Sequence, residues 1–377
     1  MNRIYFDNAA TTKLDQEVLE VMLPYLTEKF GNPSSIYSYG RESRMGVETA
    51  RKSIAKLLGV KPGNIYFTSG GTESTNTAIN AAVKDLGVKR IISSPIEHHA
   101  TLHCVECFEG EGVEVAYVSI LPNGHVDLES LKSLLGASDK KTLVTLMHAN
   151  NEIGNLLPIQ EVGEICEAHG AYFHCDTVQT LGHYPLNFSE IKVHFANGAA
   201  HKFHGPKGVG ILYIADNIHI HPYLKGGGQE RNMRAGTENL YGIVGVAKAL
   251  EMAMEHLETE AEHIRSLKKY MAKQLKSAFP EVVFNGDWDG NSLYTVLNAS
   301  FPKTEKTDML LMNLDMQGIC VSGGSACSSG ASAGSHVIDN LPNSENVTPV
   351  RFSFSKYNTQ EEVDTVIETI KNILNHK

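Results

Sequence analysis

Lys202 is the residue from which a chemical function can be argued. It lies between small residues and the turn Gly205-Pro206-Lys207-Gly208, where the backbone can crowd a flat ligand and low polarity favours a neutral, nucleophilic amine. A lysine in this setting can form a Schiff base. Most loop lysines are solvated instead, so this interpretation depends on the residues upstream.

The turn Gly70-Gly71-Thr72 is a candidate phosphate site. It follows the apolar residues 65–67 and precedes a helical pattern over 74–86. Such a turn leaves several backbone N–H groups free beside the positive end of the helix dipole, which favours an anion. The alternative is an ordinary strand-to-helix turn, because short glycine motifs give many false positives.

Polar residues gather where predicted strands end. Strands over 90–93, 113–118, 142–147 and 171–175 alternate with helical patterns, which indicates a mainly parallel sheet with its site at the carboxyl ends of the strands. Thr72, His98, Asn151, Asp176 and Gln179 fall at that edge. A carboxylate there could pair with a protonated pyridine nitrogen, and an amide could bind a phenolic oxygen. Taken singly, an Asp at a strand end is more often a turn or cap residue.

Cys327 is the candidate thiol. It lies in the segment 319–335, which is so rich in glycine and serine that it predicts a loop, where a thiol is exposed with a pKa near about 8.5. Exposure favours reactivity, but no basic neighbour is evident. Cys104 and Cys107 with His103 could suggest a metal site, yet no second Cys-x-x-Cys pair exists, so we predict helix residues there and no metal.

The length and pattern of the chain predict two domains. With 377 residues, the chain exceeds what a single compact core usually holds. We expect a large α/β domain over 15–255, and a smaller α+β domain formed by 1–14 and 256–377. One long helical pattern over 242–278 would link them.

Composition excludes several classes of function. The formal net charge of -10 and the lack of a basic cluster argue against nucleic acid or an anionic membrane as partner. The sequence has no window near 18 apolar residues and no apolar signal-peptide core at its start, so we expect a cytoplasmic protein. Six scattered cysteines in a chain of this length are typical of reduced thiols.

The motifs, in their order and spacing, resemble those of the cysteine desulfurases, which belong to the pyridoxal-phosphate-dependent class V aminotransferase family. The resemblance runs nearly from end to end and is carried by these segments: 7–12, 30–34, 68–74, 97–98, 148–154, 176–179, 201–202, 226–230, 233–237, 322–329 and 350–353. It implies a fold-type I transferase with a seven-stranded, mainly parallel sheet in the large domain.

The resemblance also implies how pyridoxal 5'-phosphate is held. Lys202 would bind it covalently, Asp176 would pair with the ring nitrogen, Gln179 would contact the ring oxygen, and His98 would stack on the ring and move a proton. The residues implied at the phosphate are Gly71, Thr72, His201 and, from the neighbouring subunit of a homodimer, Thr237. Asn151 is implied in binding the cofactor and, with Arg351, the substrate carboxylate, a task that suits a bidentate guanidinium.

The implied reaction converts L-cysteine to L-alanine. Lys202 would take the α-proton, and Cys327 would accept the sulfur as a persulfide for a separate acceptor or scaffold protein, such as one for iron–sulfur cluster assembly. Two alternatives remain: another class V enzyme, such as a selenocysteine lyase or an aminotransferase, and a binding protein without catalysis. The chain departs from the family pattern at Ala199, where a phosphate-binding serine is common, and at Gly323 and Lys356.

Overall fold

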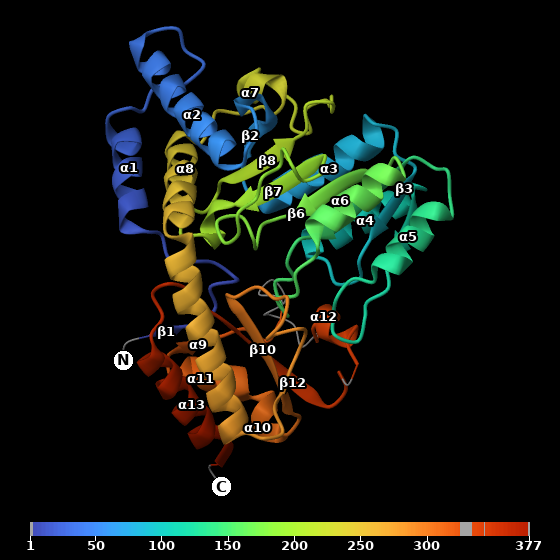
Figure 1. Ribbon diagram of the computed structural model, residues 1–377. Helices are drawn as coiled ribbons and strands as arrows, with labels where there is room; N and C mark the ends of the chain where they lie inside the picture. The colour runs from blue at the N-terminus through green and yellow to red at the C-terminus, as the bar shows by residue number, and fades with distance from the viewer. Residues whose placement is uncertain (1–2, 325–333, 343, 376–377) are drawn as a thin grey trace.

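The computed structural model describes residues 3–324, 334–342 and 344–375. Cys327 lies outside the described residues. The described chain forms two bodies, one built on a large sheet and the other on smaller sheets and the last helix (Figure 1).

The larger body contains a seven-stranded sheet, as predicted. Only β8 pairs antiparallel with its neighbours, and the other pairings are parallel. The order across the sheet is β2 (Ile65–Thr68), β8 (Gly210–Ile214), β7 (Phe195–Ala199), β6 (Tyr172–Asp176), β5 (Thr142–Met147), β3 (Arg90–Ser93) and β4 (Glu114–Tyr117).

Helices cover both faces of this sheet, which explains why its strands read as nearly continuous apolar runs. Side chains alternate between faces along a strand: Ile91 and Leu143 pack with α3 (Gly71–Lys84) and α4 (His99–Gly110), whereas Ile92 and Val144 join the opposite core. The helices of that opposite core are α1 (Gln16–Thr27), α2 (Ser38–Leu57), α5 (Leu128–Gly136), α6 (Ile159–Ala168) and α8 (Leu240–Glu255). Short helical turns occur at Pro62–Asn64, Ala200–Lys202 and α7 (Gln229–Asn232).

The smaller body has its own core. An antiparallel sheet of β12 (Val347–Ser353), β10 (Val296–Pro302) and β9 (Val283–Phe284) lies beside the parallel pair β1 (Ile4–Tyr5) and β11 (Ile319–Cys320). Its helices are α9 (Leu257–Ala278), α10 (Glu305–Asp308), α11 (Leu310–Met316) and α13 (Gln360–Asn375). The short helix α12 (His336–Asp339) packs instead against Ile96 and Ile153 of the larger body. Phe6, from the start of the chain, is fully buried in this second core. On these two cores we base the proposal of two domains, 15–255 and 1–14 with 256–377.

The helical pattern predicted over 242–278 is interrupted. His256, with φ -103° and ψ 8°, ends α8 and begins α9. The two helices have different partners, since α8 packs on α1 and α2 whereas α9 packs on α13. A break at the boundary lets each helix follow its own core, a constraint that sequence periodicity does not contain.

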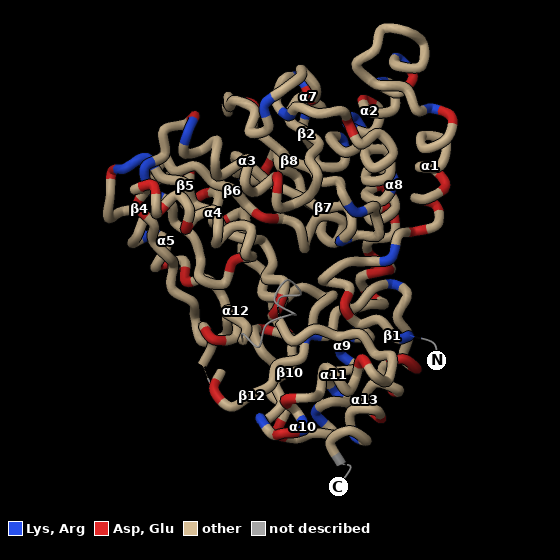
Figure 2. Tube along the Cα trace, turned by 180° about the vertical axis from the view of Figure 1, so that it is seen from behind, with Lys and Arg blue, Asp and Glu red and all other residues tan. Residues whose placement is uncertain are grey.

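Two further properties are the length of the helices and the distribution of charge on the surface. No helix in the described ranges is long and apolar enough to span a bilayer. Acidic and basic residues are interspersed over both bodies (Figure 2), and the overall balance is acidic.

Candidate active site

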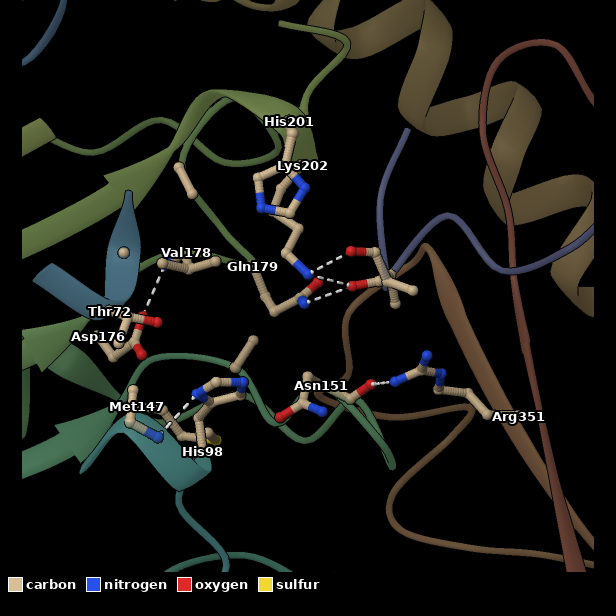
Figure 3. Close-up of a pocket in the computed structure, with 16 residues that line it drawn as sticks. Thr72, His98, Met147, Asn151, Asp176, Val178, Gln179, His201, Lys202 and Arg351 are labelled. Carbon is tan, nitrogen blue, oxygen red and sulfur yellow. Dashed lines mark hydrogen bonds between the residues drawn. The ribbon is translucent and has the colours of Figure 1, made fainter. Parts of the chain in front are cut away.

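The carboxyl ends of the central strands line a pocket of about 220 Å³. Nine of the predicted site residues meet there: Gly71, Thr72, His98, Asn151, Asp176, Gln179, His201, Lys202 and Arg351. Figure 3 shows Thr72 and Asp176 at one end, Arg351 at the other, and Lys202 and His98 on opposite sides between them. Residues spread over 280 positions of the chain therefore face one space.

Lys202 enters the pocket from the helical turn that follows β7. Gly205 permits this turn, because a Cβ there would lie 2.8 Å from the Cβ of Ala200. The Lys202 ammonium donates to the carbonyl oxygens of Ala9 at 2.6 Å and Ala10 at 2.9 Å (Figure 3). Sequence reasoning missed the role of these two alanines, because a backbone carbonyl gives no side-chain signal.

Asp176 lies at the end of β6, with its Oδ1 atom held by two donors. The Val178 N–H donates to Oδ1 at 2.9 Å, and the Asn197 amide donates to the same atom at 3.2 Å. Both bonds go to Oδ1, so Oδ2 can accept a further donor from a ligand. Gln179 is turned toward the N-terminal segment, where its amide donates to the Ala9 carbonyl at 3.1 Å.

The turn before α3 fits an anion. Gly70 provides no side-chain cap, and Gly71 and Thr72 of the first turn of this 14-residue helix line the pocket. An anion there can therefore meet uncapped N–H groups at the positive end of the helix dipole. Gly71 is required here, because a Cβ would lie 2.7 Å from Cγ2 of Val178. His201 is nearby, with Nδ1 3.1 Å from the Thr11 hydroxyl. Burial and the charge of Lys202 lower the pKa of His201 to about 4, so its ring is neutral.

His98 forms the N-cap of α4. Its Nδ1 accepts the N–H of Ala100 at 3.1 Å, which fixes the ring and leaves the proton of a neutral imidazole on Nε2. Burial lowers the pKa of His98, against the opposing effect of the Asp176 charge. The ring is therefore a neutral, oriented group across the pocket from Lys202.

Arg351 closes the other end of the pocket from β12. Its Nη1 donates to the Asn151 carbonyl at 2.8 Å, and its Nη2 pairs with Asp7 at 2.7 Å. The side chain is buried, and its Nε atom has no hydrogen-bond partner among the described residues. Arg351 lines the pocket, and the planar fork of a guanidinium matches a ligand carboxylate in charge and geometry.

Thr237 does not line this pocket. It borders a second hollow with Ser69 and Arg234, where Arg234 pairs with Glu73 of α3 at 2.9 Å. The preceding segment is backbone-strained, since residues 230–232 all have positive φ. Glu230 is held there by a buried bidentate pair with Arg51, at 2.8 and 2.9 Å. Placement of Thr237 in a neighbouring subunit stays a prediction.

The structure shows which residues surround the three positions that depart from the family pattern. Ala199 lines the pocket wall beside Gly71, where no hydroxyl is available. Lys356 joins Asp15 at 2.8 Å to Glu260 at 3.0 Å and so links the two bodies. At Gly323 a Cβ would lie 2.6 Å from Leu311.

Burial makes Cys104, Cys166 and Cys175 poor nucleophiles, because it disfavours the thiolate form. Burial raises the pKa of Cys104 and of Cys166 to about 12, and raises the pKa of Cys175 well above its ordinary value. Cys104 and Cys107 lie on α4, as predicted. None of the five described cysteines lines the pocket.

A family model described as aminotransferase class-V matches residues 4–366. The chain belongs to the class V aminotransferase family. It is 44% identical over 375 residues to a cysteine desulfurase IscS of Dictyoglomus turgidum, which covers 98% of this chain and 94% of that one. It is 43% identical to a putative cysteine desulfurase IscS 1 of Bacillus subtilis, with 99% of each chain covered.

Solved structures agree with this family assignment. A NifS-like protein superposes with a TM-score of 0.91 at 38% identity, covering 99% of each chain. The class V resemblance and the predicted fold are therefore confirmed. The matches to these relatives span nearly the whole chain, so both bodies lie within the compared region.

Proposed function

We propose that this chain is a cysteine desulfurase that converts L-cysteine to L-alanine and transfers the sulfur to Cys327. The observation that carries the proposal is the arrangement of one pocket: an amine between a carboxylate and anion-binding turn at one end and a buried guanidinium at the other. The full-length similarity to proteins named cysteine desulfurases supports the same activity.

Pyridoxal 5'-phosphate fits the residues present. The uncapped start of α3 at Gly71 and Thr72, with His201, suits the phosphate, and Asp176 with a free oxygen suits the ring nitrogen. Lys202 would bind the cofactor covalently, and His98 would cover the ring. When bound, this cofactor supplies an electron sink for a carbanion at the substrate α-carbon.

The residues of the chain supply the remaining requirements. Arg351, with Asn151 beside it, would bind the substrate carboxylate and so fix which bond of the α-carbon faces Lys202. The Lys202 amine would take the α-proton, and the neutral Nε2 of His98 can hold or donate a proton on the opposite side. A thiolate at Cys327 would take the substrate sulfur and leave alanine.

We also propose that the active unit is a homodimer, with Thr237 completing the phosphate site of the neighbouring subunit. Large apolar side chains are exposed along α1, α2 and the segment between them, and a contiguous patch of this kind indicates a protein interface. They are Leu23, Leu26, Phe30, Ile36, Tyr37, Tyr39 and Met45. A fully active monomer in sedimentation would contradict this assembly.

The persulfide would pass to a separate acceptor protein, such as a scaffold for iron–sulfur clusters. We propose that this chain acts in the cytoplasm. The five described cysteines are free thiols, which is typical of proteins in a reducing compartment.

Two variants test the function at separate steps. Lys202→Ala should abolish turnover, and borohydride should no longer attach the cofactor to the chain; an adduct mapped by mass spectrometry to Lys207 instead would contradict the assignment. Cys327→Ala should still change the visible spectrum when cysteine is added, yet release almost no alanine and carry no persulfide. Near-normal alanine release from Cys327→Ala would favour a lyase that does not need this thiol.

A further inference from the structure

A buried chain of hydrogen bonds leads away from Asp176 beneath the pocket. Asn197, on β7, donates its amide to Asp176 Oδ1 at 3.2 Å, and its Oδ1 lies 3.0 Å from Nε2 of His174. The other ring nitrogen of His174 lies 2.8 Å from the hydroxyl of Thr145. All four side chains are buried, and His174 and Thr145 completely so.

The chemistry of these groups fixes the direction of every bond. A carboxylate can only accept, so Asn197 must direct its NH₂ toward Asp176 and its carbonyl oxygen toward His174. His174 must then donate from Nε2. Its Nδ1 is left as an acceptor for the Thr145 hydroxyl. Burial lowers the pKa of His174, which keeps the ring in this neutral form.

Asn197 also bonds to α3, the helix whose first turn lies with Asp176 at the same end of the pocket. Its NH₂ group has a second hydrogen, and Thr75 accepts it at 3.2 Å. Thr75 lies one turn into α3, the helix whose first turn begins at Gly71. One amide therefore joins the carboxylate at one point of the pocket to the helix that presents N–H groups at another.

We propose that Asn197 is a positioning residue, which fixes Asp176 relative to the first turn of α3 so that a ligand with a cationic ring nitrogen and a phosphate is held at both points together. This inference rests on the proposed function. Asn197 is not one of the residues that line the pocket, so it would not touch a ligand there. It acts through Asp176 and Thr75.

The test uses the cofactor-free protein and titrates it with pyridoxal phosphate. Asn197→Leu keeps the size of the side chain and removes all of its hydrogen bonds. We expect the dissociation constant for pyridoxal phosphate to rise about tenfold or more, because removing the hydrogen-bond partner of a ligand-binding group usually weakens binding by this much. We also expect the visible absorption band of the bound cofactor to depend on pH in a different way.

Asn64→Leu is the matched control. Asn64 is another buried amide, next to the edge strand β2 of the same sheet, and it donates to the Asp216 carboxylate at 2.7 Å. This variant loses a comparable bond far from the pocket, so it should keep wild-type affinity and spectrum. An equal loss of affinity in both variants would show general destabilisation and overturn the positioning role.

Asn197→Asp covers the case in which the leucine variant does not fold. A carboxylate at 197 would face Asp176 on one side and His174 on the other. We expect His174 to become protonated in this variant, visible as an upward shift of its imidazole C–H titration by NMR, with weakened cofactor binding. Wild-type affinity and spectrum in Asn197→Asp or Asn197→Leu would refute the inference. Failure of the wild-type protein to bind pyridoxal phosphate would instead refute the proposed function.

Discussion

Glu97 provides the sharpest stability prediction, because it is a buried carboxyl with only half of its hydrogen-bonding capacity used. Oε1 accepts the Met147 N–H at 2.9 Å, and Oε2 has no partner within the described part of the chain. Burial raises the pKa of Glu97 well above its ordinary value of 4.5, and the charge of Asp176 adds to this effect. The folded protein therefore keeps the proton of Glu97 to a higher pH than the unfolded chain does.

The sign and size of the consequence follow from proton linkage. Above pH 4.5 the unfolded chain releases this proton and the folded chain retains it, so stability falls as pH rises toward the folded pKa. The slope for one proton is about 1.4 kcal/mol per pH unit. For a chain of 377 residues, this corresponds to about 2 °C of Tm per pH unit.

Glu97→Gln removes the titration while it keeps an acceptor for Met147. Its Tm, measured by calorimetry at equal protein and cofactor concentrations, should rise relative to wild type by about 2 °C per pH unit as the pH is raised above 4.5 toward the folded pKa of Glu97. The extra amide hydrogen is unpaired and lowers stability equally at every pH, so the slope is the decisive quantity. Glu129→Gln, on the exposed surface of α5, should run parallel to wild type. A parallel course for Glu97→Gln would refute the reasoning.

Three further predictions probe separate contacts. Glu230→Ala should cost about 3 to 5 kcal/mol in urea unfolding, because Arg51 is left buried without its bidentate partner; Glu48→Ala, at the exposed partner of the same arginine, should cost less than about 1 kcal/mol. Arg351→Lys should raise KM for cysteine about tenfold or more, since an ammonium cannot reproduce the planar fork. Gly71→Ala should weaken pyridoxal phosphate binding by a similar factor, because the added methyl group would lie 2.7 Å from Cγ2 of Val178 and so displace the anion-binding turn.

Each of these three has a clear contrary outcome. Equal costs for the two glutamate variants would show that burial of the Arg51 pair is unimportant. An unchanged KM with lowered kcat in Arg351→Lys would place the arginine outside substrate binding. Gly110→Ala, at a helix end where the added methyl group meets no atom within 4 Å, is the control for Gly71→Ala.

Much of the fold and of the pocket was predictable from the sequence because local pattern carried it. The strands of the central sheet are short apolar runs, buried on both faces, and the polar residues that end them fall at one edge by topology alone. The order of strands and helices is therefore enough to place Asp176 and His98 near Lys202. The final helix carries a local signal as well, since Thr359 and Glu362 form a capping box at the start of α13.

The remaining features depend on contacts between distant segments, which leave no local pattern. The break at His256 follows from the separate partners of α8 and α9. Residues 230–232 have left-handed backbone conformations although none of them is a glycine, so the sequence gives no sign of this turn. The turn depends on the contact of Glu230 with Arg51, which is 179 positions away in the chain. Asn197 reads as one more residue of a small-residue strand, and its place between Asp176 and Thr75 is set by the packing of β7 against β6 and α3.

The contacts of the first ten residues have a consequence for synthesis of the chain. Ala9 receives the Lys202 ammonium and donates its own N–H to Ser353, while Asp7 pairs with Arg351. Domains fold from the N-terminus as they leave the ribosome, so the sheet of the larger body can form while β12 is still untranslated. Residues 7–10 must therefore wait for β12, the last strand of the described chain, before they are locked in place. Under the proposed function, binding of pyridoxal phosphate with its full set of contacts therefore requires that residues 7–10 and β12 have already come together.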